Sequence, residues 1–239
     1  MAKSVFKIIM FFIVGLIGGI FADQILWPYF IERPLFFKYR IDNPPVEVTE
    51  VNEIYIRENE ALEEAIDKVK DSVAGIQIRT KQSFLKESGW IITHDGLLVS
   101  LCNSFPDPLQ ILGITVYVDG EEVEAELVEE KDSIVSMKIE KDRLTTNPVL
   151  DIEKVNLGER VFLVKPLFQE DKVVKMVNLG IVRGKDKNII YTNIIEDETA
   201  IGGILFDIEG YILGIANGID SYGRLSALSI SEIRNSVGF

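Results

Sequence analysis

Apolar and polar residues alternate with a period of two over much of the chain after residue 72. Such alternation is typical of half-buried β-strands. Turn dipeptides lie between neighbouring apolar runs at Asp95-Gly96, Asp119-Gly120 and Glu209-Gly210, and each predicts a β-hairpin. We expect about a dozen short strands and a brief helix near 229–236, a pattern that favours antiparallel barrels or a sandwich.

The first 31 residues have a different pattern. Lys3 and Lys7 precede the uncharged run Ile8–Ala22, and an aromatic belt follows it at Trp27, Tyr29 and Phe30. A membrane needs about 20 apolar residues, and aromatic side chains favour its interface. We interpret 1–31 as a cytoplasmic stub and a transmembrane helix, with the rest of the chain extracytoplasmic. A signal peptide cleaved after Ala22 is the alternative.

The segment between this anchor and the strands divides into a stalk and a helix. Residues 32–57 contain two adjacent prolines and are expected to form the stalk. A short helix follows, because apolar residues recur at helical spacing, at Leu62, Ala65, Ile66 and Val69. The folded domain is then expected over 58–239. We expect this domain to have two parts, at about 58–147 and 148–239, with the segment "TTNPVL" at 145–150 as the connection between them.

Composition excludes several functional classes. The formal charge of −13, without a basic stripe, disfavours nucleic acid as a partner. Cys102 is the single cysteine and His94 the single histidine, so an internal disulfide is impossible and an ordinary structural zinc site has too few ligands. We therefore expect neither a metal nor another cofactor.

Six segments, in order over residues 57–239, resemble the protease domain of HtrA-type, trypsin-like serine endopeptidases. They read "DSVAGI", "SGWIITHDGLLVS", "VDGEEVEAELVEEKDSIVSMKIE", "VNLGERVFLV", "LGIVRG" and "TAIGGILFDIEGYILGI". The resemblance implies an all-β domain of two six-stranded antiparallel barrels with a catalytic cleft between them, preceded here by the transmembrane helix and the short helix. Since the chain stops about where that domain should end, we expect no PDZ module.

The resemblance also indicates which residues occupy the catalytic positions. The family's histidine falls on Asn103, its aspartate on Ser133 and its serine on Ile201. None of these side chains can act as the base, the orienting carboxylate or the nucleophile of a triad. The glycine two positions before the serine falls on Thr199, so the oxyanion turn that ends at Gly202 is expected to be altered.

Other residues invite a catalytic interpretation, and each has a simpler one. His94 lies in a hairpin turn nine residues from Asn103 and is expected to be a solvated turn residue. Cys102 adjoins the histidine position, but without a base nearby little of its thiol would be ionised. We therefore expect it to be a small buried apolar residue. The acidic residues of 119–132 alternate with apolar residues, so we expect them to lie on the solvent-exposed face of a half-buried strand. Asp132 precedes Ser133 by one residue, so it points to the opposite face.

The leading hypothesis is a membrane-anchored extracytoplasmic pseudoprotease with a protein-binding or scaffold role. The groove between the barrels could take an unfolded or extended peptide as an added strand, or the domain could bind an envelope protein. Two alternatives stay open: an active peptidase of unrecognised mechanism, with Cys102 as its best candidate, and a purely structural envelope protein. HtrA-type proteases commonly trimerise, so a homo-oligomer is possible, although no residue here indicates one.

Overall fold

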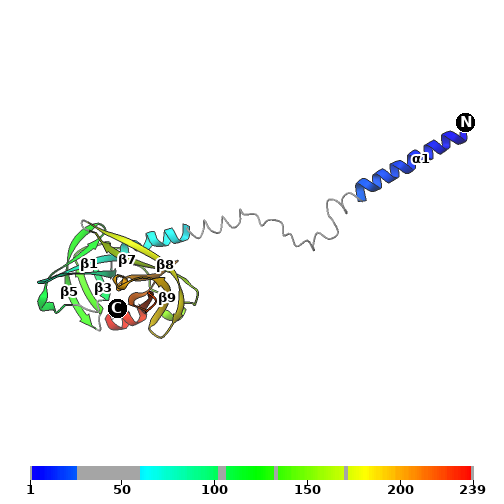
Figure 1. The fold of residues 1–239 in the computed structure, drawn as a ribbon. Helices are drawn as coiled ribbons and strands as arrows, with labels where there is room; N and C mark the ends of the chain where they lie inside the picture. The colour runs from blue at the N-terminus through cyan, green and yellow to red at the C-terminus, as the bar shows by residue number, and fades with distance from the viewer. Residues whose placement is uncertain (1, 26–59, 102–105, 132–133, 170–171, 238–239) are drawn as a thin grey trace. The chain divides into compact units, whose positions relative to one another are not determined.

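The computed structural model describes residues 2–25, 60–101, 106–131, 134–169 and 172–237. Two compact units divide the chain, Met1–Tyr55 and Ile56–Phe239. The described part of the first unit is helix α1 (Ala2–Phe21), drawn in blue in Figure 1. The apolar segment Val5–Ile25 is 21 residues long, enough to cross a bilayer, and its side chains are exposed. An apolar N-terminal helix is thus confirmed.

The second unit starts with the expected short helix, described over 60–69, and continues through a 3₁₀ turn at Lys70–Ser72 into the strands. The first six strands form a closed antiparallel barrel in the order β1-β2-β3-β6-β5-β4. Their bounds are β1 Val73–Thr80, β2 Phe84–Ile91, β3 Leu97–Leu101, β4 Ile111–Val118, β5 Glu121–Lys131 and β6 Ile134–Ile139.

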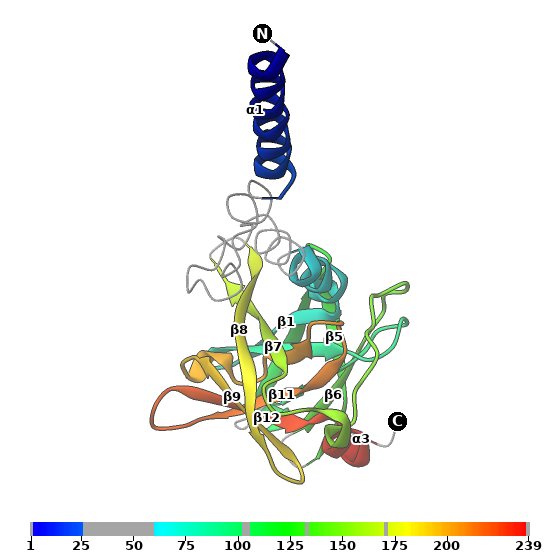
Figure 2. The same cartoon turned by 90° about the vertical axis from the view of Figure 1, so that its right-hand side faces the viewer.

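The other six strands form a second closed antiparallel barrel in the order β10-β11-β12-β9-β8-β7. Their bounds are β7 Arg160–Phe168, β8 Val173–Lys185, β9 Ile189–Ile195, β10 Ile204–Asp207, β11 Ile212–Ile219 and β12 Arg224–Ser229. Helix α3 (Ile230–Val237) follows β12 and contacts β6 and β11, as the red ribbon in Figure 2 shows. The predicted pair of six-stranded barrels is therefore confirmed.

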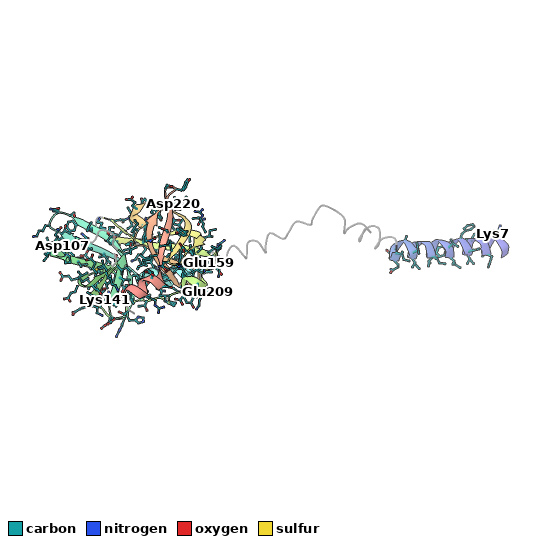
Figure 3. The ribbon with its side chains drawn as sticks, turned by 90° about the horizontal axis from the view of Figure 1, so that it is seen from below. Lys7, Asp107, Lys141, Glu159, Glu209 and Asp220 are labelled. Carbon is teal, nitrogen blue, oxygen red and sulfur yellow. The ribbon has the colours of Figure 1, made fainter. Side chains whose placement is uncertain are left out.

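The turn between β4 and β5 illustrates how local sequence sets the register. Asp119 and Gly120 have φ of 54° and 77°, as a two-residue hairpin of the primed type requires, and Val118 pairs with Glu121 across it. Lys141 bonds to Glu121 at 2.7 Å and lies 3.6 Å from Asp119; Figure 3 labels its position. The glutamates of β5 are exposed, which confirms that they lie on the solvent-exposed face of this strand.

Three apolar cores hold this unit together. One fills the first barrel and a second fills the second barrel. The third lies between the barrels and includes Trp90 of β2, Phe162 of β7 and Phe206 of β10. The helix over 60–69 and helix α3 both contribute to it, through Val69 and Ile233 among others. The barrels therefore pack on each other through a continuous apolar interface, at one edge of which the candidate site lies.

Candidate functional site

Three chain segments that the sequence links to catalysis converge beside this interface. Leu101, at the end of β3, pairs with Ile134, the first residue of β6. Gly202 lies so close to both β2 and β3 that an added Cβ would stand 3.5 Å from the carbonyl oxygen of Leu101 and 3.6 Å from Ser88. The turn that leads into β10 of the second barrel therefore abuts strand ends of the first.

This convergence brings together the immediate neighbours of the predicted positions. Asn103 follows Leu101 by two residues, Ser133 directly precedes Ile134, and Ile201 directly precedes Gly202. Asn103, Ser133 and Cys102 lie outside the described residues, as does Asp132. Ile201 is described and half-buried. The assignment of the triad positions therefore stays a prediction.

A short 3₁₀ helix, Glu198–Ala200, forms the turn before Ile201. Asp197 caps it, because its Oδ1 accepts the backbone N–H of Thr199 at 3.0 Å and the Thr199 hydroxyl at 2.5 Å. These two bonds, the hydroxyl first, lower the pKa of Asp197. The N–H of Ile201 donates to the carbonyl oxygen of Glu198 at 3.2 Å. Each of these two amides thus has an acceptor within the turn.

That arrangement bears on the oxyanion hole. In trypsin-like enzymes the hole is formed by the backbone N–H groups of the nucleophile and of the residue two positions before it. At the positions predicted from the resemblance, the matching amides would be those of Ile201 and Thr199, and both are engaged inside the turn. Neither is presented to a ligand in this conformation. The other predicted member of the turn, Gly202, has φ of +86° and donates its N–H to Ala216 of β11 at 2.8 Å.

A buried polar cluster lies against this turn. Lys165 of β7 is 7% exposed, and its ammonium donates to Glu196 at 2.7 Å and to the hydroxyl of Thr199 at 3.2 Å. Asn178 of β8 donates to the other carboxylate oxygen of Glu196 at 3.1 Å. This cluster was not among the residues predicted from the sequence. The available signal was a lysine inside the apolar run "VFLVKPLF", where a buried charge requires a partner.

One strand edge next to the turn is open among the described residues. Strand β11 pairs with β10 as far as Ile204–Ile215, and on that side Ala216 then donates its N–H to the carbonyl oxygen of Gly203 and accepts the N–H of Gly202, each at 2.8 Å. Beyond it, Gly218 and Ile219 pair with Ser226 and Leu225 of β12, after a register shift between Ala216 and Gly218 that leaves Asn217 without a partner in that ladder. The backbone groups on the other side of Asn217–Ile219 are therefore placed to pair with a further strand.

His94 has a structural environment that is separate from this cleft. Its Nδ1–H donates to the carbonyl oxygen of Leu144 at 2.6 Å, and its Nε2 lies 3.3 Å from the Thr146 hydroxyl. It precedes Leu97, which is at the other end of β3 from Leu101. The ring is exposed and ties the β2–β3 turn to the connection between the barrels. No group of three metal-binding side chains occurs among the residues that the structure describes.

The fold and the converging strand ends define a double barrel consistent with the trypsin-like class. The chain is similar to the probable periplasmic serine endoprotease DegP-like of Halomonas elongata, at 29% identity over 138 residues, which is 54% of this chain. The match spans 28% of that relative's length. No family model matches the chain. The HtrA-type resemblance is thereby confirmed as a distant similarity.

Proposed function

We propose that this protein is a membrane-anchored, extracytoplasmic relative of HtrA-type proteases that binds extended polypeptide without hydrolysing it. The observation that carries the proposal is the turn at 197–202, where an isoleucine replaces the nucleophile and both candidate oxyanion amides are engaged. The open edge of β11 lies directly beside that turn. The two features together favour retention of a binding surface without the reaction.

The chemistry supports the first half of this proposal. Acyl transfer needs a nucleophile, a base within hydrogen-bond reach and donors for the oxyanion. Ile201 has no heteroatom, and Asn103 in the histidine position does not accept a proton near neutral pH. Closure of the turn removes the third requirement in this conformation. A cleft that lacks all three has no route to a tetrahedral intermediate.

The open strand edge supports the second half. An extended peptide that adds to Asn217–Ile219 would form main-chain hydrogen bonds that do not depend on its sequence. The half-buried side chain of Ile201 would offer such a peptide an apolar contact. The apolar helix α1 would keep the binding domain tethered to the bilayer. Broad, weak recognition of unfolded chains is the result that this geometry favours.

Photo-cross-linking of the full-length protein in detergent micelles tests the proposal. A benzoylphenylalanine is placed at Asn217, and a matched control is placed at Glu124 on the exposed face of β5. We expect capture of purified, reduced and alkylated casein from position 217 but not from 124, with the casein intact on a gel. Equal capture at both positions would contradict binding at the β11 edge. Casein cleavage that Cys102→Ala abolishes would instead establish the active-peptidase alternative.

A further inference from the structure

A second concave region lies on the outer face of the first barrel, where the β7–β8 hairpin packs against it. One cavity of about 500 Å³ is lined by β1, β2, β4, β5 and the hairpin, and includes Lys86, Tyr117, Phe168 and Lys172. A smaller cavity of about 130 Å³ adjoins it, shares Tyr117 and Lys172, and is also lined by Lys175. We call the two cavities together the β7–β8 groove. Their combined volume is within the range of small-molecule sites.

Gly75 explains why the hairpin can pack so closely here. A Cβ at this position would lie 3.1 Å from the ring of Phe168 and 3.1 Å from Val173. The missing side chain therefore lets the hairpin approach β1. Phe168 in turn meets Tyr117 edge to face, with ring centroids 5.8 Å apart. These contacts give the groove a fixed aromatic wall.

The groove gathers positive charge in an otherwise acidic protein. Lys86, Lys172 and Lys175 all line it, and none of the three has an ion-pair partner among the described residues. The ammonium of Lys86 lies 5.4 Å from the centroid of the Phe168 ring. With a net charge of −13, carboxylates are abundant elsewhere on the surface. Within the described part of the chain, no carboxylate therefore forms an ion pair with these three lysines.

Lys175 is the most constrained of the three. Its ammonium donates to the carbonyl oxygen of Val73, and burial lowers its pKa to about 8, against the opposing effect of Asp71 and Asp119. A cation held in this way is under-compensated, because a neutral carbonyl offsets less of the desolvation cost than a carboxylate would. An anion in the groove would supply the missing charge.

The remaining lining limits the kind of anion. Glu122 and Asp119 stand at the same groove and would repel a dianion more strongly than a monoanion. The hydroxyl of Tyr117 donates to Oε1 of Gln77 at 2.9 Å, which uses the amide oxygen as the acceptor and leaves the NH₂ group of Gln77 as a donor. The aromatic wall suits an apolar body attached to the charged group.

We propose that the β7–β8 groove binds a carboxylate joined to an aromatic or aliphatic body. Lys175 and Lys172 bind the carboxylate, and Tyr117 and Phe168 contact the body. Two sources share this chemistry, a free small carboxylic acid and the C-terminal residue of a polypeptide. The site is separate from the β11 edge, so this inference does not depend on the proposed peptide binding there.

Calorimetric titration of the full-length protein in detergent micelles tests the inference. The probes are N-acetylphenylalanine, its amide, inorganic phosphate, and a tetrapeptide ending in phenylalanine as the free acid or the amide. We expect each acid to bind about tenfold more tightly than its amide, the size of one charge-assisted contact. Tighter binding of N-acetylphenylalanine than of the tetrapeptide acid would identify a small carboxylic acid as the ligand. The reverse order would identify a polypeptide C-terminus. Equal binding of acid and amide, tighter binding of phosphate, or no binding of either acid would overturn the proposal.

Variants locate the site and separate binding from folding. Lys175→Met is expected to weaken acid binding about tenfold, whereas Lys187→Met, in the exposed β8–β9 turn, leaves it unchanged. Because Lys175 titrates near pH 8, acid binding at that pH should take up protons, seen as a heat that depends on the buffer's ionisation enthalpy. Lys175→Met should remove this dependence. Should Lys175→Met not fold, the exposed Lys172→Gln must weaken acid binding; unchanged binding contradicts the proposal.

Discussion

The interface between the barrels and the turn beside it are neighbours with opposite physical characters. Trp90, Phe162 and Phe206 are almost completely buried, and the last two stack with ring centroids 5.5 Å apart. The turn at 197–201 is largely exposed and held by side-chain caps and one buried ion pair. Apolar packing therefore stabilises the interface, while polar contacts hold the turn beside it.

The largest effect is expected at the interface. Phe206→Ala removes a fully buried aromatic ring from between the barrels and should lower the free energy of unfolding by about 3–5 kcal/mol. Denaturant unfolding of the detergent-solubilised chain measures the change. Leu109→Ala, at a side chain that is 87% exposed, is the control and should shift the free energy by less than about 0.5 kcal/mol. Equal effects of the two variants would refute a stabilising interface.

The next effect is expected at the ion pair beneath the turn. Lys165→Met leaves Glu196 buried without its ammonium partner and should cost about 3 kcal/mol of unfolding free energy. Lys70→Met breaks the exposed Lys70–Asp67 pair and should change the stability far less, because solvent screens that pair. Glu196→Gln added to Lys165→Met should restore much of the loss, because no uncompensated charge remains. Without such recovery, lost packing and not charge would explain the first variant.

The fold could be predicted because its signals are local and repeated. Asp119-Gly120 needs positive φ at both positions for a tight hairpin, and the strands on either side alternate as a half-buried sheet requires. The barrel pair itself came from the order of the resembling segments. The inter-barrel core was less accessible, because Phe162 and Phe206 are 44 positions apart in the sequence and nothing local pairs them.

The candidate site was predictable only in part, for a similar reason. The assignment of Ile201 to the family's serine position follows from the aligned segment and stays a prediction. The closed turn depends on Asp197 bonding two residues ahead, a pattern visible in sequence but not specific. The Lys165–Glu196–Asn178 cluster joins β7, the end of β9 and β8, and sequence periodicity cannot place three such side chains together.

A smaller effect with a defined pH dependence is expected at Asp207, which lies at the end of β10 and is 4% exposed. Burial raises its pKa above 3.8, opposed by N–H donors from Tyr211 and Glu209 and reinforced by the charges of Glu159 and Glu209, labelled in Figure 3. Because the pKa is raised in the folded state, the contribution of the protonated Asp207 carboxyl to stability is fully present below pH 3.8. This contribution is lost as the pH rises through the folded-state pKa.

Asp207→Asn keeps the acceptor for both N–H donors and removes the buried charge. It should be more stable than wild type at pH 7, by up to about 1 kcal/mol, and the gain should vanish near pH 3. Denaturant midpoints across this range measure it. Asp207→Ala loses the acceptor as well and should be destabilised at every pH. A gain for Asn that grows as the pH falls would show that the sign is wrong.

The smallest expected effect is at the residues predicted to occupy the family's catalytic positions. Ile201→Ser combined with Thr199→Gly places a serine and a glycine at the positions predicted to match the family's nucleophile and turn glycine, yet casein hydrolysis should remain at background. A serine without a base is not activated, and Asn103 does not take its proton. Trypsin in the same micelles serves as the positive control. Hydrolysis that appears only in the double variant would show that the cleft supplies a base from another residue, which would contradict the assignment of Asn103 to the histidine position. A silent double variant with unchanged casein cross-linking at Asn217 would instead separate binding at the β11 edge from the chemistry of the turn.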